Sequence, residues 1–283
     1  MARRTRQNPE YDSELETIAA GRRLMEEWSE NYLERRSVAD LLHFPMASFG
    51  GGRPGRSNLS VSIRHGPDGT GGGTDHRDAE WGYSLVDSID VVQPSSVKGH
   101  NINTFRRLRP DGTTYGVGIS RLTIFTLRDG KWAFQIVSSC GLRPPEQVYD
   151  AADERMRAEV RTLILAMVDA YNRRDLEQLR TVCNYPLVRL DRLEWSEHAQ
   201  PADLSIDFDT VQSRTGWSSS GVRYLDVRIP QSDDKVVATL TVARYAADGR
   251  ELPPEDSVYL VTRQDNRWGI QASSTRYAIG GLL

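Results

Sequence analysis

The first half of the chain holds most of the side chains that could carry out acid–base chemistry. Four of the five histidines lie there: His43, His65, His76 and His100. Imidazole titrates near neutral pH and can therefore accept or release a proton under physiological conditions. His43 lies where a short helix is expected to end and a sheet to begin, so it is a candidate general base or proton shuttle. The alternative is a half-buried imidazole that is hydrogen-bonded to the backbone.

The segment GHNINTFRR, residues 99–107, has the alternation of a strand and carries polar side chains. Alternation places four side chains on one face: Asn101, Asn103, Phe105 and Arg107. His100, a second candidate base, then lies on the other face. Asparagines on an apolar sheet face need hydrogen-bond partners, and a bound ligand is one such partner. Two alternatives are a bulge that turns the asparagines into water, and a structural ion pair for Arg107, which matches Arg244.

A glycine-rich segment, residues 50–78, ends in His76 and leads into Trp81 and Tyr83. Such a composition cannot form a packed core, and glycine hinges next to titratable and aromatic residues are typical of a lid over a site. His76 is therefore the third candidate acid–base group, and Trp81 and Tyr83 are candidate substrate-binding residues. A solvated loop without function is the alternative. The segment contains no GxxxxGK[ST] phosphate loop.

The composition excludes several classes of partner. The formal net charge of −3 argues against nucleic acid, because a phosphate backbone calls for a surplus of Lys and Arg. No apolar run is long enough to cross a membrane. Cys140 and Cys183 share no metal-ligand or redox spacing, which predicts a reduced, cytoplasmic protein without a structural disulfide. Metal, nucleotide and nucleophile motifs are missing as well, so we expect no cofactor and no metal.

The chain repeats itself, and the repeat predicts the domain organisation. Trp132 and Trp268 are 136 residues apart, as are Gln135 and Gln271. The same offset relates Trp81 to Trp217, whereas HFPMASF (43–49) matches NYPLVRL (184–190) at an offset of 141. A longer loop in the first half accounts for the change of offset. We therefore predict two similar domains, residues 12–142 and 154–283, joined by the Pro-containing linker GLRPPEQVYDAAD.

Each half shows the same order of elements. A long amphipathic helix comes first, with apolar residues at helical spacing around Met25 and Trp28 and around Ile164 and Met167. A short helix opened by Ser37 or by Asp175 follows. Short strands separated by DG turns complete each half. Helices followed by an antiparallel sheet are the pattern of an α+β fold, here two tandem cones in which helices pack on a curved sheet.

Each half has two helices, then a Phe/Tyr-Pro step (HFP or NYP), and then a sheet that ends in DGKWAFQ or DNRWGIQ. This order resembles the nuclear transport factor 2-like, or SnoaL-like, superfamily. The resemblance covers nearly the whole chain twice and is clearest over residues 236–275. It implies a mostly apolar pocket in each cone. The superfamily includes cofactor-free isomerases, dehydratases, cyclases and lyases as well as non-catalytic binding proteins, so the resemblance implies the fold more strongly than the chemistry.

The expected function is a cofactor-independent lyase or dehydratase that acts on a small, mostly apolar aromatic alcohol in the N-terminal pocket. Lignin-derived diarylpropane lyases, which release water and formaldehyde, are one such class that the chain resembles. One of the three histidines would transfer the proton while Tyr83, Asn103 and Arg107 orient the substrate. The alternatives are a non-catalytic small-molecule binding or assembly module, or an isomerase or polyketide cyclase. Homo-oligomers are compatible with either reading. In the second half, Arg189 and Asp191 are expected only to pair on the surface.

Overall fold

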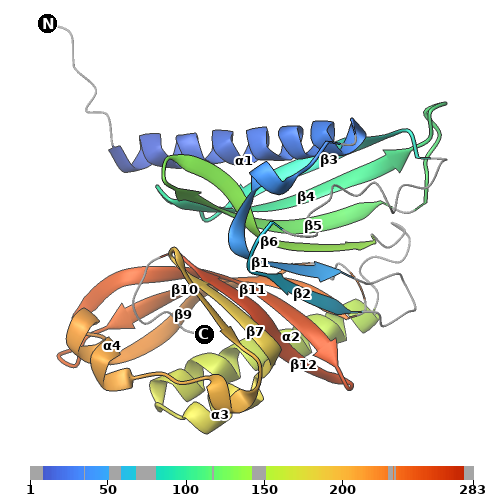
Figure 1. The fold of residues 1–283 in the computed structure, drawn as a ribbon. Coiled ribbons are helices and arrows are strands. Elements are labelled where there is room, and N and C mark those ends of the chain that lie inside the picture. The colour runs from blue at the N-terminus through green and yellow to red at the C-terminus, as the bar shows by residue number, and fades with distance from the viewer. Residues whose placement is uncertain are drawn as a thin grey trace, which may run out of the picture. The chain divides into compact units, whose positions relative to one another are not determined.

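The structure is a computed structural model that describes residues 9–34, 36–50, 59–67, 81–116, 118–141, 151–228, 232 and 234–276 (Figure 1). Its contacts divide the chain into two compact units, residues 1–48 with 62–138 and residues 49–61 with 139–283. Each unit contains one six-stranded sheet with helices packed on it. The predicted α+β class, helices on two separate sheets, is confirmed. Below, each unit is described by itself.

The first sheet has the strand order β2-β1-β6-β5-β4-β3, and helix α1 runs along β3 and β4 (Figure 1). Its elements, in chain order, are α1 (Pro9–Leu33), a 3-10 turn (Ala39–Leu41), β1 (Leu42–Gly50), β2 (Ser60–Arg64), β3 (Tyr83–Val92), β4 (Lys98–Leu108), β5 (Ile119–Arg128) and β6 (Lys131–Gly141).

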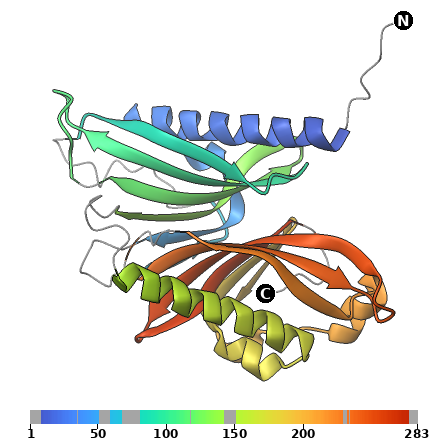
Figure 2. The same ribbon diagram turned by 180° about the vertical axis from the view of Figure 1, so that it is seen from behind.

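The second sheet has the corresponding order β8-β7-β12-β11-β10-β9, and helix α2 packs on β9 and β12 (Figure 2). The pair β7–β12 is parallel, so the sheet is mixed rather than wholly antiparallel. Its elements are α2 (Ala151–Asn172), α3 (Leu176–Thr181), β7 (Cys183–Asp191), β8 (Glu194–His198), a 3-10 turn (Pro201–Asp203), α4 (Phe208–Thr215), β9 (Ser219–Val227), β10 (Lys235–Tyr245), β11 (Glu251–Gln264) and β12 (Arg267–Thr275).

The predicted second helix differs between the two halves. Asp175 caps α3 as expected, because its carboxylate accepts a hydrogen bond from the Gln178 N–H at 3.0 Å. In the first half the Ser37 hydroxyl accepts from the Ala39 N–H, but the segment forms only the 3-10 turn. Part of the glycine-rich insertion is also regular structure: Ser60–Arg64 forms strand β2, so the prediction of an unstructured flap was wrong for these residues.

The long helices bury one face against their sheets. Leu24 and Met25 of α1 pack with Phe125 and Phe134 in the first core. The second core contains Ile164 and Met167 of α2 with many strand residues. In both helices the buried residues have the helical spacing that the sequence predicts. The apolar stripe of each helix therefore determines which sheet face becomes the core. None of the described helices is long and apolar enough to span a membrane.

Candidate functional site

A cleft of about 70 Å³ lies between α1 and the sheet of the first unit. Helix α1 contributes three lining residues, and the chain from Trp81 through β3, β4 and β5 contributes the rest. The lining residues are Met25, Trp28, Ser29, Trp81, Ser84, Val86, Phe105, Arg107 and Arg121. The lining therefore combines apolar and aromatic groups with two arginines, and no acidic side chain is among its described residues.

Both arginines of the cleft lie over aromatic rings. The Arg107 guanidinium carbon is 4.8 Å from the centre of the Trp81 ring. The Arg121 guanidinium carbon is 4.8 Å from the Phe105 ring and 5.5 Å from the Trp28 ring. Such cation–π contacts hold the planar guanidinium groups in place against the aromatic rings.

The sheet face that forms the cleft continues into a buried polar floor. Asn101 and Asn103 are fully buried, and Thr123, directly opposite Asn101 on β5, is 1% exposed. The Asn101 Nδ2 donates to the Gly21 carbonyl of α1 at 3.1 Å. Within the described residues, the Asn101 Oδ1, both polar atoms of the Asn103 side chain and the Thr123 Oγ1 have no hydrogen-bond partner. Unpaired buried polar groups are costly, so these atoms call for a partner such as a water molecule or a ligand.

The predicted alternation of β4 is confirmed by its pairing with β5. Asn101 lies opposite Thr123, Asn103 opposite Arg121 and Phe105 opposite Ile119, without a register shift. Four predicted substrate-binding residues therefore share one face, and two of them, Phe105 and Arg107, line the cleft itself. The alternative of a bulge that exposes the asparagines is excluded for this pair of strands.

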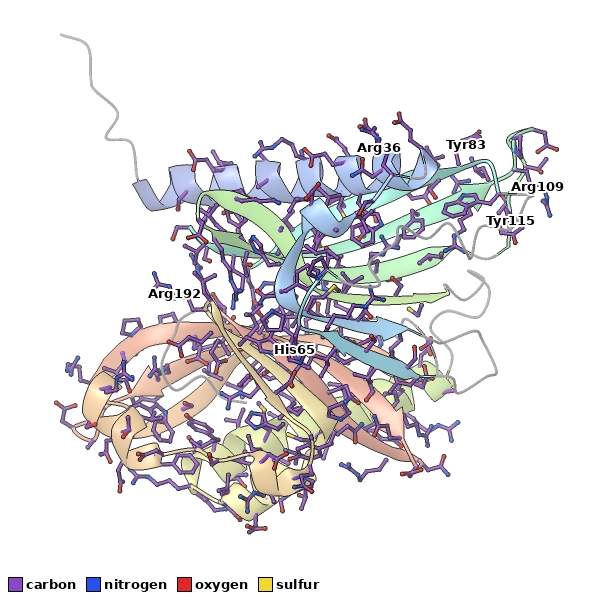
Figure 3. All side chains as sticks on the ribbon, in the orientation of Figure 1. Arg36, His65, Tyr83, Arg109, Tyr115 and Arg192 are labelled. Atoms are coloured by element: carbon purple, nitrogen blue, oxygen red, sulfur yellow. The ribbon has the colours of Figure 1, made fainter. Side chains whose placement is uncertain are left out.

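Trp81 and Tyr83 occupy different positions although they are two residues apart. Trp81 is buried in the cleft lining, and its indole N–H donates to the Tyr83 carbonyl at 2.9 Å. The Tyr83 side chain is 38% exposed at the start of edge strand β3 and does not line the cleft (Figure 3). The structure thus brings Trp81 to the arginines and leaves the Tyr83 hydroxyl outside.

His43 belongs to a hydrogen-bond network that occurs in both units. Its Nδ1 lies 2.9 Å from the Thr126 hydroxyl, which donates to the Gln135 Oε1 at 3.2 Å. In the second unit the Asn184 Nδ2 donates to the Thr262 hydroxyl at 2.9 Å, and that hydroxyl donates to Gln271 at 3.0 Å. An asparagine thus fills the same role as His43, which makes this imidazole part of the link between strands.

His100 is fully buried on the sheet face opposite Asn101 and Asn103. Burial, reinforced by the charge of Lys98, lowers the pKa of His100 to about 3. Burial, reinforced by Arg128 and Lys131, lowers the pKa of His43 to about 4. Thr126, the partner of His43, lies on the same face as His100, so neither histidine faces the cleft. His76 lies outside the described residues, and His65 is exposed after β2 (Figure 3).

The sequence reading did not find Arg121, Trp28 and Met25, which complete the cleft. Arg121 could have been found from the DG turn that aligns β5 with β4, because that turn places it opposite Asn103. The two residues from α1 carry no such signal, since their spacing only predicts a core face. No group of three or more His, Cys, Asp or Glu side chains with metal-binding geometry occurs among the described residues.

The prediction that Arg189 and Asp191 pair on the surface was half wrong. They pair, with an N–O distance of 2.7 Å, but their side chains are only 11% and 18% exposed. They lie on the face of the second sheet that packs on α2, next to a second ion pair between Arg244 and Glu255. The sequence could not show that this pair is buried, because the helix and strands that cover it, including the strand of Glu255, are other segments of the chain.

The solved structures to which the chain is similar each cover less than half of it, at low identity. No family model matches the chain, and no curated protein matches it either. Similar solved structures include a nuclear transport factor 2-like protein of unknown function from Pseudomonas putida, at 14% identity and a TM-score of 0.37, covering 43% of this chain and 86% of that one. A hexachlorocyclohexane dehydrochlorinase from Novosphingobium barchaimii has 16% identity and a TM-score of 0.38, covering 44% and 88%. The association domain of a Caenorhabditis elegans CaMKII has 10% identity and a TM-score of 0.34, covering 44% and 98%.

Proposed function

We propose that the cleft of the first unit binds a small organic carboxylate that carries an aromatic or apolar group. The observation that supports this is the pair of arginines, Arg107 and Arg121, in a lining whose described residues include no acidic side chain. Arginine is suited to a carboxylate because its planar fork can donate two parallel hydrogen bonds.

The internal repeat indicates a carboxylate of the second unit that has no counterpart in the first cleft. Arg107 corresponds to Arg244 of the second half, whose side chain lies 3.9 Å from Glu255. Glu255 pairs with Val242 on β10, and the residue that pairs with the corresponding Phe105 on β4 is Ile119. An apolar side chain thus stands where the second unit has the carboxylate. A ligand carboxylate would supply the missing charge.

The dimensions and the lining determine which part of the ligand enters. A volume of about 70 Å³ is about half that of a cavity of about 150 Å³ that holds benzene. The cleft therefore accommodates the carboxylate and the adjoining edge of a ring, in contact with Phe105, Met25 and Val86. Asn103, the next residue on the same face of β4, is placed to bind a further polar substituent.

The side chains that line the cleft favour binding of the ligand without a chemical reaction. An elimination needs a proton acceptor, and the described residues of the lining include no histidine, carboxylate, tyrosine or cysteine. His43 and His100 are neutral near pH 7 but lie on the opposite face of the sheet. A cofactor-free lyase acting on an aromatic alcohol, the activity expected from the sequence, remains a prediction and would require a group from outside this lining.

Titration of the full chain with benzoate tests the proposal. We expect Arg107→Gln and Arg121→Gln each to weaken benzoate binding by about tenfold or more, because hydrogen bonds to a charged group contribute about 1.5–3 kcal/mol. Arg106→Gln is the matched control: this neighbour is exposed and bonded to Asp87 at 2.9 Å. Calorimetry gives the affinity, and NMR of the same samples over time reports any loss of water from added 2-phenylethanol to give styrene.

Equal benzoate affinity in the Arg106→Gln and Arg107→Gln chains would contradict the proposal. So would tighter binding of benzyl alcohol than of benzoate, because the arginines would then contribute nothing. Loss of water from 2-phenylethanol that persists after dialysis against a chelator would instead establish the lyase.

A further inference from the structure

The inner face of the second sheet holds a group of buried polar side chains that the proposed function does not use. Tyr259 on β11 lies opposite Ser273 on β12, which lies opposite Arg189 on β7. One residue pair further along, Ser257 lies opposite Thr275, which is paired with Asp191. Cross-strand neighbours have Cβ atoms about 5 Å apart, so these side chains form two adjoining rows.

Two ion pairs border these rows and cancel each other's charge. Arg189 binds Asp191 at 2.7 Å, and Arg244 lies 3.9 Å from Glu255, whose side chain is 2% exposed. The side chains of Arg189 and Arg244 are themselves 11% and 10% exposed. These two ion pairs therefore add no net charge to the rows.

Several donors in this group still have no acceptor. In the described part of the chain, the Arg189 Nε, the Arg244 Nη2 and the Ser273 Oγ are buried without a hydrogen-bond partner. The hydroxyls of Tyr259 and Ser257 have no side-chain partner beyond each other. A structural ion-pair network would leave few such atoms, because each one lowers stability. The convergence of unused donors points to a ligand that accepts hydrogen bonds.

The two tyrosines of the group are held in their protonated form. Burial, followed by the charge of Glu255, raises the pKa of Tyr171, and the charges of Arg189, Arg244 and Asp191 also act on it. Burial also raises the pKa of Tyr259. The Tyr171 ring packs against Trp217 with centroids 4.8 Å apart, so an aromatic wall adjoins the donors. Neutral phenols donate hydrogen bonds to carbonyl and hydroxyl oxygens.

We propose that this buried group, comprising Arg189, Arg244, Ser273 and Tyr259, is a second ligand site, which binds an uncharged small molecule through its carbonyl or hydroxyl oxygens. A charged ligand is disfavoured because both arginines already have carboxylate partners and an added charge would be buried without compensation. The first unit differs at the corresponding strand positions, where Thr123 replaces Tyr259. The two units are therefore equipped for different ligands, and this inference does not depend on the benzoate site.

Acetophenone tests the second site, because it differs from benzoate mainly in having a methyl group in place of a charged oxygen. We expect the full chain to bind acetophenone and the Tyr259→Phe chain to bind it at least tenfold more weakly. Removal of a buried hydroxyl that lacks a structural partner should leave the Tm unchanged or raise it. Tyr224→Phe is the matched control, since Tyr224 is 55% exposed in the same unit. Ser273→Ala provides a second, smaller change in the same row.

If Tyr259→Phe lowers the Tm and leaves the acetophenone affinity unchanged, the Tyr259 hydroxyl has a structural role and the proposal is overturned. Absence of acetophenone binding to the unmodified chain overturns it too. Benzoate affinity, measured on the same variants, should not change. A failure of benzoate binding alone would concern the first cleft and leave the second site intact.

Discussion

Acidification should destabilise the protein through His100, and the effect can be isolated by one substitution. His100 is fully buried, and its folded-state pKa of about 3 lies below the ordinary value of 6.5. The folded chain therefore holds this imidazole neutral at pH values where the unfolded chain protonates it. The resulting stability is present above pH 6.5 and is lost progressively as the pH falls toward 3.

The size of the effect follows from the two pKa values. At pH 5.0 the unfolded imidazole is about 1.5 pH units below its pKa, whereas the folded one remains neutral. Each unit corresponds to about 1.36 kcal/mol, so His100 alone should lower the free energy of unfolding by about 2 kcal/mol between pH 7.5 and pH 5.0. His100→Val removes the titrating group, and valine is the residue that the second half carries at the corresponding position, Val237.

Urea unfolding at pH 7.5 and pH 5.0, performed on the unmodified and His100→Val chains, measures the difference. The other titrating groups are common to both chains, so their contributions cancel. We expect the unmodified chain to lose about 2 kcal/mol more than the variant over this interval. An NMR titration that follows the imidazole directly provides a second readout.

Equal losses of stability in the two chains would refute the reasoning, as would an imidazole that titrates near pH 6.5 in the folded state. Either result would mean that His100 reaches water. It would then also be available for proton transfer, which its present burial does not favour.

Two further outcomes are expected. Gly21→Ala should destabilise the first unit, because the added Cβ would lie 2.7 Å from the Phe125 Cζ and 2.8 Å from the Asn101 Oδ1. The clash should cost about 1–3 kcal/mol, which exceeds the gain in helix propensity of about 1 kcal/mol. Ala19→Gly in the same helix measures that propensity term. An unchanged or higher Tm for Gly21→Ala would argue against this contact. Dialysis against a chelator should leave benzoate binding and the Tm unaltered, and a loss restored by one divalent metal would show that a metal site exists.

Local patterns in the sequence predicted a large part of the architecture. The alternation in residues 99–107 was sufficient to group Asn103 with Arg107 and to separate them from His100, because side chains of a strand alternate by geometry. The cap at Asp175 was also predictable, since it depends on a residue three positions away. The separation into two equivalent sets of strands followed from the offset of 136 residues.

The assembly of the sites was decided by the tertiary structure. Arg121 meets Trp28 because β5 pairs with β4 and α1 crosses the same face, and the contact of α1 with this face is not local in the chain. The same holds for Arg189: a strand pattern shows that it shares a face with Asp191, but only packing against α2 shows that this face is buried. The sequence thus determined the elements and the face of each side chain, while long-range pairing decided which faces meet, because that choice depends on register and burial across segments that are distant in the chain.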